Sequence, residues 1–343
     1  MSLEKRLQEM PEGIESQDVK ELRQVILRLQ KQLKQSKERS EDLVEATHRG
    51  AYDAMIALGA VPPVSAPQKD TRKVNPEVAL IHTTDWQGAK VTTSYNTEIM
   101  RDRVMQFSEK VVHLTNLQRH HHPVKECVVM FGGDMVEGLF NYPAQLWQID
   151  ASLFGQFTSV SRLCVDFVRE MLANFEKVTV IAEWGNHGRI GGKRAEVPKS
   201  DNVDRMVYEM SRQILAGEKR LTWEDCPEDI QEVEIGNYRA LLMHGDELGR
   251  SGFASPAAWI AGANRWKAGA HDYDFHDIFL GHYHRHAQEP IQKHYNIYWT
   301  GSTESDNRYA RDSMAASGKP SQRLHFVDPI RGRTTAQYQV WLD

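Results

Sequence analysis

Residues 127–138 read CVVMFGGDMVEG, an apolar strand candidate that ends in a Gly-Gly turn carrying Asp134. Four other segments repeat this pattern, in which an apolar stretch gives way to Asp, Asn, Gln or His. In chain order, the five segments are Thr84-Asp85-Trp86-Gln87, Gly133-Asp134, Gly185-Asn186-His187, Met243-His244-Gly245 and Gly281-His282-Tyr283-His284. Polar residues just past the carboxyl ends of strands line the active-site crevice of α/β folds. The five segments therefore predict one common site.

Each of these polar residues has a simpler explanation when it is taken alone. Asp85 and Asp134 could be turn formers or helix caps, and Asn186 could be a turn residue. His282 and His284 would share one face of an extended strand, which by itself is ambiguous. All of these explanations would have to hold together for the ordered pattern to lack a function. Asp, Asn and His with one shared carboxylate are what two neighbouring divalent cations require.

The remaining apolar patterns predict an α/β fold. Strands are expected at 78–83, 127–131, 178–182, 238–243, 278–280, 297–300, 324–327 and 337–341. Helices are expected at 100–117, 151–175 and 203–215. Early strands alternate with helices, whereas later strands follow one another closely. This order implies an α/β sandwich in which helices cover mixed sheets.

The first 75 residues differ from the rest of the chain. A helix is predicted at 17–58, with Ser16 as its N-cap. A heptad seam runs through Val19, Leu22, Ile26, Leu29 and Leu33. Such a seam favours a coiled coil and a homo-oligomer, although an amphipathic helix packed on its own domain is the alternative. The predicted organisation is an N-terminal helical oligomerisation segment at 1–59, a Pro-containing linker at 60–75 and a catalytic domain at 76–343.

Composition predicts a packed globular core. Hydrophobic residues make up 40% and charged residues 26% of the 343 residues. The net charge of -5 gives no general attraction to nucleic acid or anionic membrane, so a nucleic-acid substrate would need a local basic surface or bound metal. The cysteines Cys127, Cys164 and Cys226 show no CxxC spacing, which favours a reduced, cytoplasmic compartment. No signal core and no membrane span are expected.

The ordered motifs resemble those of the calcineurin-like metallophosphoesterase superfamily, over roughly residues 78–284. The Gly-His-Xaa-His ending at 281–284 is similar to the nuclease and phosphodiesterase branches, in particular the SbcD-type DNA-repair nucleases. The segments at 132–138 and 185–189 also resemble stand-alone phosphoesterases of bacteriophages. The resemblance implies a four-layer αββα sandwich behind the N-terminal helical segment. It also implies the host cytoplasm as the location if a phage encodes the chain.

The resemblance implies a site for two divalent metal ions. One ion would be held by Asp85, Gln87, Asp134 and His284. The other would be held by Asp134, Asn186, His244 and His282, so that Asp134 bridges the pair. Mixed nitrogen and oxygen ligands suit Mn²⁺, the expected metal, with Mg²⁺, Fe, Ni or Zn as alternatives. His187 would be catalytic, either stabilising the transition state or protonating the leaving oxygen.

Two positions depart from the superfamily pattern. Gln87 stands where a His usually follows the first Asp, and an amide carbonyl is a harder and weaker ligand than imidazole. It should favour Mn²⁺ or Mg²⁺ over Zn²⁺. Gly188 stands where an acidic residue often orients the catalytic His, so another group must do so. Asp246 and Glu137 are the candidates for that role.

Basic residues after the Asn-His motif are candidate substrate contacts. Arg189, Lys193 and Arg194 lie in or just after the Gly-rich stretch at 188–192. Backbone N–H groups and cations there could hold a phosphate. A solvated loop is the alternative.

Aromatic residues after Asp134 offer a second kind of substrate contact. Tyr142 and Trp147 could stack on bases of single-stranded or frayed nucleic acid, with core packing as the alternative. Arg250, Asn264 and Arg265 lie in a Gly- and Ala-rich segment after His244 that is predicted as a mobile, substrate-facing loop.

The expected function is a metal-dependent phosphodiesterase that hydrolyses DNA, as an exonuclease or end-processing nuclease, through a two-metal-activated hydroxide. DNA is therefore the expected substrate. A phosphomonoesterase or small-nucleotide phosphodiesterase with the same metal site is the first alternative. A non-catalytic oligomeric scaffold, favoured by the unusual Gln87, is the alternative from another class.

Overall fold

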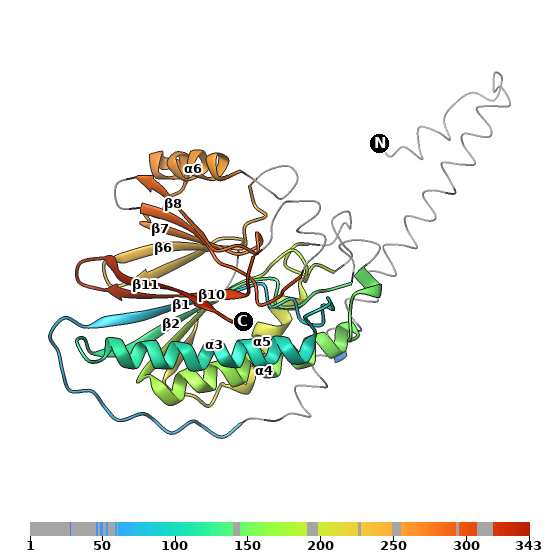
Figure 1. Ribbon diagram of the computed structural model, residues 1–343, viewed down its shortest axis with the longest axis horizontal. Coiled ribbons are helices and arrows are strands. Elements are labelled where there is room, and N and C mark those ends of the chain that lie inside the picture. Colours follow the sequence, from blue (N-terminus) through green and yellow to red (C-terminus); the bar gives the residue numbers. More distant parts are fainter. Residues whose placement is uncertain are drawn as a thin grey trace, which may run out of the picture. The chain divides into compact units, whose positions relative to one another are not determined.

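The computed structural model describes residues 61–139, 145–190, 198–225, 228–248, 255–292, 295–306 and 318–343, with six single positions before residue 60 (Figure 1). The chain divides into two units, residues 1–46 and 47–343, and the fold is that of the second. The predicted helix at 17–58 lies outside the described residues apart from single helical positions such as Arg28 and Asp53. Residues 61–76 contain no helix or strand. The Asp70 backbone N–H donates a hydrogen bond to the Glu176 carboxylate, and the Arg220 guanidinium donates one to the Val64 carbonyl.

Six strands form the first sheet, in the order β11-β10-β1-β2-β3-β4. β1 to β4 run parallel, whereas β10 is antiparallel to β1 and β11 to β10. The strands are Glu77–Thr83 (β1), Val124–Gly132 (β2), Lys177–Glu183 (β3), Leu221–Trp223 (β4), Ser321–Asp328 (β10) and Arg333–Trp341 (β11). Residues 127–132 of β2 are all buried, as expected for a parallel strand covered on both faces.

Five strands form the second sheet, in the order β5-β6-β7-β9-β8. They are Gln231–Ile235 (β5), Tyr238–Met243 (β6), Asp277–Leu280 (β7), Ala287–Gln292 (β8) and Tyr295–Trp299 (β9). β6, β7 and β9 are parallel, and the edge strands β5 and β8 are antiparallel to their neighbours. A parallel pair needs a crossover connection, which a helix between β6 and β7 supplies.

Helices cover the outer face of each sheet, which gives four layers (Figure 1). The first sheet carries α3 (Thr97–Gln118), α4 (Leu153–Asn174) and α5 (Val203–Ile214), and the second carries α6 (Pro256–Arg265). A 3-10 turn, η1 (Gln145–Trp147), and a π-helical turn, η2 (Trp266–Ala270), follow in the connections. These four α-helices each begin after a side-chain cap: Asn96, Ser152, Asn202 or Ser255. The predicted αββα sandwich is confirmed.

Strand β6 shows how one strand contributes to two cores. Ala240 and Leu242 pack between the two sheets. Leu241 and Met243 pack on the opposite face, together with Trp259 of α6. Successive side chains of a strand point to opposite faces, so an unbroken apolar run indicates a strand covered on both sides.

Four elements differ from the sequence prediction, which did not include β4, β5, β8 or α6. β4 has only three residues, and β8 is an edge strand that tolerates Pro290 because its outer side has no ladder. The predicted mobile loop is wrong for Asn264 and Arg265, which end helix α6, and Arg250 lies outside the described residues. Gly262 of this helix packs closely on Leu248, because a Cβ there would lie 2.8 Å from the Leu248 Cδ1 methyl group.

The predicted motifs meet at one edge of the sandwich because each follows a strand directly. Asp85 comes two residues after β1, Asp134 two after β2, Asn186 three after β3, His244 one after β6 and His282 two after β7. Parallel strands present their carboxyl ends at the same edge of a sheet, and the two sheets bring their edges together. The fold therefore positions the candidate site.

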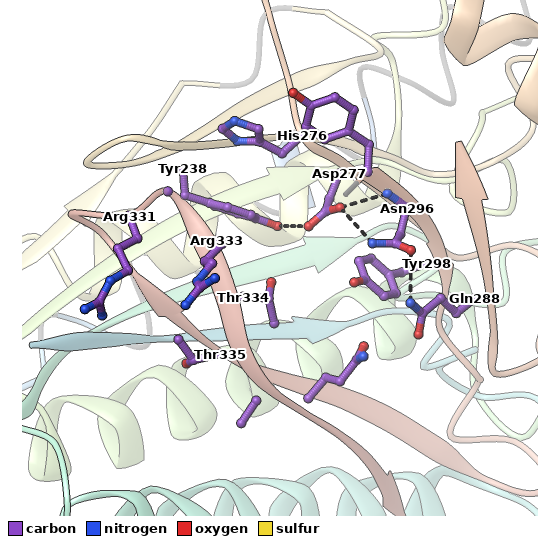
Figure 2. Close-up of a pocket in the computed structure, with 14 residues that line it drawn as sticks. Tyr238, His276, Asp277, Gln288, Asn296, Tyr298, Arg331, Arg333, Thr334 and Thr335 are labelled. Atoms are coloured by element: carbon purple, nitrogen blue, oxygen red, sulfur yellow. Dashed lines mark hydrogen bonds between the residues drawn. The ribbon is translucent and has the colours of Figure 1, made fainter. Parts of the chain in front are cut away.

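A pocket of about 490 Å³ lies at the opposite ends of β6 and β7 (Figure 2). The carboxylate of Asp277, the first residue of β7, accepts hydrogen bonds from the Tyr238 hydroxyl at 2.7 Å and the Asn296 backbone N–H at 2.9 Å. Arg331 in the same pocket pairs with Asp328 at 2.8 Å. These polar groups satisfy one another, and the buried carboxylate joins β6, β7 and β9.

Asp277 should make stability depend on pH. Burial raises the pKa of Asp277 from 3.8 to about 6, although Tyr238 and Asn296 act in the opposite direction. A proton therefore binds the native state more tightly than the unfolded chain, and the free energy of unfolding should fall by about 3 kcal/mol between about pH 4 and pH 6. Asp277→Asn keeps an oxygen that accepts from the Asn296 N–H, and its amide N–H can donate to the Tyr238 oxygen, so this variant should remove the fall. Urea unfolding of the wild type and of Asp277→Asn between about pH 4 and pH 8 measures this difference. If the free energy of unfolding depends on pH in the same way in both proteins, the raised pKa of Asp277 is contradicted.

Candidate metal centre

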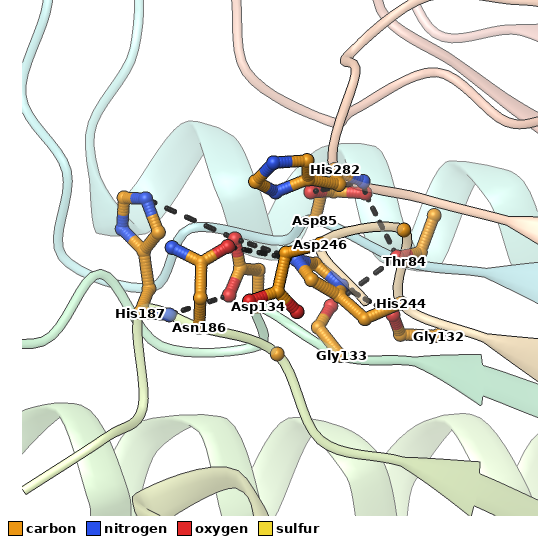
Figure 3. Close-up of polar contacts among 12 residues, drawn as sticks. Thr84, Asp85, Gly132, Gly133, Asp134, Asn186, His187, His244, Asp246 and His282 are labelled. Carbon is orange, nitrogen blue, oxygen red and sulfur yellow. Dashed lines mark hydrogen bonds and ion pairs between the residues drawn. The ribbon is translucent and has the colours of Figure 1, made fainter. Parts of the chain in front are cut away.

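The structure brings predicted ligand atoms together where the strands end (Figure 3). Two groups of side chains each offer three ligand atoms that lie within 4.8 Å of one another. One group is Asp134, His244 and His282, and the other is Asp85, Asp134 and His284. Asp134 belongs to both groups, which is the geometry that a bridging carboxylate requires.

The backbone at these residues is strained. Eight non-glycine residues in the described part of the chain have a positive φ, and five of them are predicted ligands: Asp85 (53°), Gln87 (50°), Asp134 (52°), His282 (64°) and His284 (49°). A left-handed conformation costs such residues about 1 kcal/mol or more, and it persists only where the surroundings enforce it. Its concentration in one place indicates a functional site.

Hydrogen bonds between the loops enforce this conformation. The Asp85 N–H donates to the Gly133 carbonyl at 2.9 Å, and the Gln87 N–H donates to the Asp134 carbonyl at 3.0 Å. The His282 N–H donates to both Asp85 carboxylate oxygens, at 3.1 and 3.0 Å. Loops from both sheets are thereby tied into one unit.

Two motif glycines are required because other groups approach them closely. A Cβ on Gly185 would lie 2.1 Å from Asp134 Oδ1. A Cβ on Gly281 would lie 2.4 Å from Asp85 Oδ2. Contacts this short do not occur, so each glycine allows a carboxylate to reach the centre.

The second ring nitrogen of two histidines has a partner that orients the ring. His244 Nδ1 lies 2.8 Å from the Gly132 carbonyl oxygen, so Nδ1 donates and Nε2 is left for a metal. His284 Nδ1 bonds the carboxylate of Glu304, and its Nε2 lies 3.1 Å from Asp85 Oδ1. Both rings thus direct Nε2 toward the carboxylates of the centre.

Two amides lie beside the two ligand groups. Asn186 Oδ1 lies 3.2 Å from His244 Nε2. Gln87 Nε2 lies 3.3 Å from Asp134 Oδ2 and 3.4 Å from His284 Nε2, while its Oε1 is buried with no hydrogen-bond partner among the described residues. A 180° rotation of the amide would turn the oxygen toward these ligand atoms. An orphaned buried acceptor next to a shared carboxylate fits a cation site, so the residues present suit two divalent metals.

Replacing Gln87 by His should raise the affinity of the Asp85 site for Zn²⁺ by about tenfold or more, because imidazole is a softer and stronger ligand than an amide carbonyl. The affinity for Mn²⁺ should change less. Competition of the metal-free proteins with a fluorescent zinc chelator measures the difference. Equal Zn²⁺ affinity in the two proteins would contradict the assignment of Gln87 as a ligand.

The carboxylates of the centre attract positive charge. Burial opposes ionisation of Asp134, but His244 holds the pKa of that carboxyl well below 3.8. Burial alone would lower the pKa of His284, yet Glu304 and Asp85 raise it to about 10. Divalent cations bound here would supply the same positive charge.

His187 lies beside the two ligand groups and not within them. Its Nε2 is 3.8 Å from Asp134 Oδ2, and its Nδ1 is 3.0 Å from the Glu137 carbonyl oxygen and 3.3 Å from Glu137 Oε2. Burial alone would lower the pKa of His187, but Asp134 and Glu137 raise it. A protonated ring that faces the shared carboxylate can act as a general acid.

Glu137, and not Asp246, contacts the His187 ring. The Asp246 carboxylate pairs instead with Arg189, a predicted phosphate contact, at 2.6 Å. A Cβ on Gly188 would lie 2.1 Å from Asn202 Oδ1, which leaves no room for a side chain at that position. The other predicted substrate contacts, Lys193, Arg194 and Tyr142, lie outside the described residues.

Sequence reasoning missed a buried aspartate that joins two of the loops. Asp204 accepts hydrogen bonds from the Met135 and Val136 N–H groups at 3.1 Å and from the Gly185 N–H at 2.9 Å. It lies in the first turn of α5, just after the N-cap Asn202. An acidic residue there looks like an ordinary helix terminus, so no sequence signal marks it.

Comparisons with known proteins give distant similarities. No family model matches the chain. It is 21% identical over 298 residues to the SPbeta prophage-derived uncharacterized protein YonJ of Bacillus subtilis, covering 84% of this chain and 70% of that protein. Among solved structures, it is similar to Vps29 complexed with zinc from Entamoeba histolytica (12% identity, TM-score 0.33, 77% of this chain and 99% of that one).

Two further solved structures are enzymes by name. A 5'-nucleotidase from Candida albicans shows 10% identity and a TM-score of 0.35, over 81% of this chain and 54% of that chain. A protein serine/threonine phosphatase from Saccharomyces cerevisiae shows 11% identity and a TM-score of 0.31, over 88% and 90% of the two chains. In the part of the chain that the structure describes, no helix combines the length and apolar character that a membrane span needs.

Proposed function

We propose that the protein is a dinuclear-metal phosphodiesterase that hydrolyses DNA, as an exonuclease or end-processing nuclease. The observation that carries the proposal is that Asp134 belongs to two ligand groups at once. Gln87 would complete the group with Asp85 and His284, and Asn186 the other. Bound divalent ions, of which Mn²⁺ best suits the amide ligands, would supply Lewis-acid activation of water and neutralise phosphate charge.

His187 gives the site its protonation chemistry. Its ring is held by Glu137, and its Nε2 lies 3.8 Å from Oδ2 of Asp134, beside the ions that this carboxylate would hold. A proton donated from Nε2 would neutralise the leaving oxygen of the cleaved strand. The chain thereby supplies ligands and a general acid from adjacent loops.

Three observations favour DNA as the substrate. Trp147 in η1 is 89% exposed, so its aromatic face is open to solvent. Gln145 of the same turn donates to the Glu137 carbonyl at 2.6 Å, which links this turn to the residue that contacts the His187 ring. Such a face suits stacking on an unpaired base. The Gly-His-Xaa-His ending and the prophage origin of the relative point the same way.

The test is incubation of the full chain with Mn²⁺ and end-labelled linear DNA that is single-stranded, blunt or frayed, beside bis-p-nitrophenyl phosphate and p-nitrophenyl phosphate. We expect cleavage of DNA and of the diester, with little turnover of the monoester. Turnover of the monoester alone would favour the phosphomonoesterase. Two bound metals without any turnover would favour the scaffold.

We also propose that the helix at 17–58 makes the protein a homo-oligomer in the cytoplasm of a phage-infected or lysogenic cell. The support is the heptad seam, which needs a partner for its apolar stripe. Light scattering of the full chain and of a Leu22→Asp, Leu29→Asp variant tests it. Equal masses for the two proteins would contradict the proposal.

A further inference from the structure

A lysine is buried beside the candidate centre between two glutamates. Lys90 is 5% exposed, and Glu137 and Glu304 are 0% and 4% exposed. The Lys90 ammonium lies 3.6 Å from Glu137 Oε2 and 3.2 Å from Glu304 Oε2. Buried charges occur where they are paired, so one cation neutralises two carboxylates that would otherwise repel each other.

Each glutamate also holds one histidine of the site. Glu137 lies 3.3 Å from Nδ1 of His187, and Glu304 bonds Nδ1 of His284. The Lys90 ammonium therefore lies in the middle of a series of side-chain contacts. The series begins at His187, the candidate acid, and ends at His284, a candidate metal ligand. A partner of the second ring nitrogen fixes the orientation and basicity of a histidine.

The backbone ties Lys90 to the same centre. Its N–H donates to the Gln87 carbonyl at 2.9 Å, and Lys90 pairs with Ile149 in an isolated β-bridge. The loop after β1 thus carries Asp85, Gln87 and Lys90 within six residues. The loop therefore sets the position of Lys90, and the Lys90 ammonium is buried away from solvent.

We propose that Lys90 is a positioning residue that sets the orientation of His187 and His284 together, through Glu137 and Glu304. The proposal rests on the proposed function for the roles of the two histidines. With Lys90 between them, both carboxylates are held within reach of the Nδ1 atom of their histidine. Without the ammonium, no cation lies between the two buried carboxylates, and the glutamates should move from the positions that orient the two rings.

The test compares Lys90→Met, which removes the charge, with Lys90→Arg, which keeps it. Lys90→Met should lower the affinity of the Asp85 site for Mn²⁺ by about tenfold or more. It should also slow hydrolysis of a diester with a poor leaving group more than that of bis-p-nitrophenyl phosphate. Lys90→Arg should retain most of both properties. Lys177→Met is the surface control, because Lys177 pairs with Glu126 where both side chains are half exposed.

The double variant Lys90→Met, Glu304→Gln separates charge from packing. It removes the repulsion, so the dependence on the leaving group should return toward wild type while the Mn²⁺ affinity stays low. This variant provides the same two measurements if Lys90→Met alone does not fold. Wild-type values in Lys90→Met, or equal losses in the Met and Arg variants, would overturn the proposal.

Failure of the proposed function would look different. A wild-type protein that cleaves no phosphodiester would contradict the function, yet calorimetric titration of the metal-free variants with Mn²⁺ would still report on Lys90. If the wild type is active and Lys90→Met binds Mn²⁺ with unchanged affinity, the positioning role of Lys90 would be refuted, whereas the proposed function would not.

Discussion

Asp134→Asn is expected to reduce phosphodiester hydrolysis on the order of 10³-fold or more and to leave at most one tightly bound metal ion per chain. Asp134 is the one side chain that belongs to both ligand groups in the described part of the protein. An amide has the same shape but cannot offer two anionic oxygens to two cations. Metal analysis after dialysis against limiting Mn²⁺, together with turnover of bis-p-nitrophenyl phosphate, measures both effects.

The Asp134→Asn experiment distinguishes a shared ligand from a structural carboxylate. The backbone N–H of His187 donates to Asp134 Oδ1 at 2.7 Å. An asparagine oxygen can still accept this hydrogen bond, so the variant should fold. Asp166→Asn on the exposed face of α4 is a matched control. Two tightly bound metals and wild-type turnover in Asp134→Asn would refute the bridging assignment and the two-metal function that depends on it.

The strand ends could be predicted because apolar runs and the polar residues after them are local features. β6 was predicted with its observed bounds, Tyr238–Met243, since every inward and outward position except Arg239 is apolar or aromatic. β5 and β8 were not, because edge strands alternate with exposed polar residues and resemble loops. The fold could therefore be inferred from its buried strands and from the edge strand β11, but not from the edge strands β4, β5 and β8.

The candidate ligands could be predicted for the same local reason, whereas their supports could not. Glu304 lies 20 residues after His284, and no pattern around it suggests that its carboxylate holds that ring. Lys90 looks like an ordinary surface lysine until the fold places Glu137 and Glu304 on either side. Such partners depend on which loops the tertiary structure brings together, and a single sequence does not state this.

Glu137 shows where sequence reasoning reached its limit. The family resemblance implied an acidic partner for His187 at position 188, where this sequence has glycine, and Glu137 was one of the two substitutes predicted. Only the structure separates them, because Asp246 is engaged by Arg189 at 2.6 Å. Packing explains why position 188 carries no acidic side chain, because the Asn202 amide occupies the space beside Gly188.

His187→Gln is expected to lower the rate of DNA cleavage by roughly 10² to 10⁴-fold while both metal ions stay bound. Its ring belongs to neither ligand group and approaches Asp134 only to 3.8 Å, so metal affinity should change little. A general acid matters most when the leaving oxygen is a strong base. The loss should therefore be large for an alkoxide leaving group, as in DNA, and much smaller for p-nitrophenolate.

The dependence on the leaving group decides between the two roles that the geometry allows for His187. If the ring only stabilised charge on the phosphate, its loss would slow both kinds of diester equally, since both develop that charge. Glu137→Gln offers a graded comparison, because it keeps a hydrogen-bond acceptor for Nδ1 but removes the negative charge that raises the pKa of His187. It should show the same selectivity at smaller magnitude. Equal loss on both substrates in the two variants would assign His187 to charge stabilisation, and the proton for the leaving oxygen would then have to come from another group.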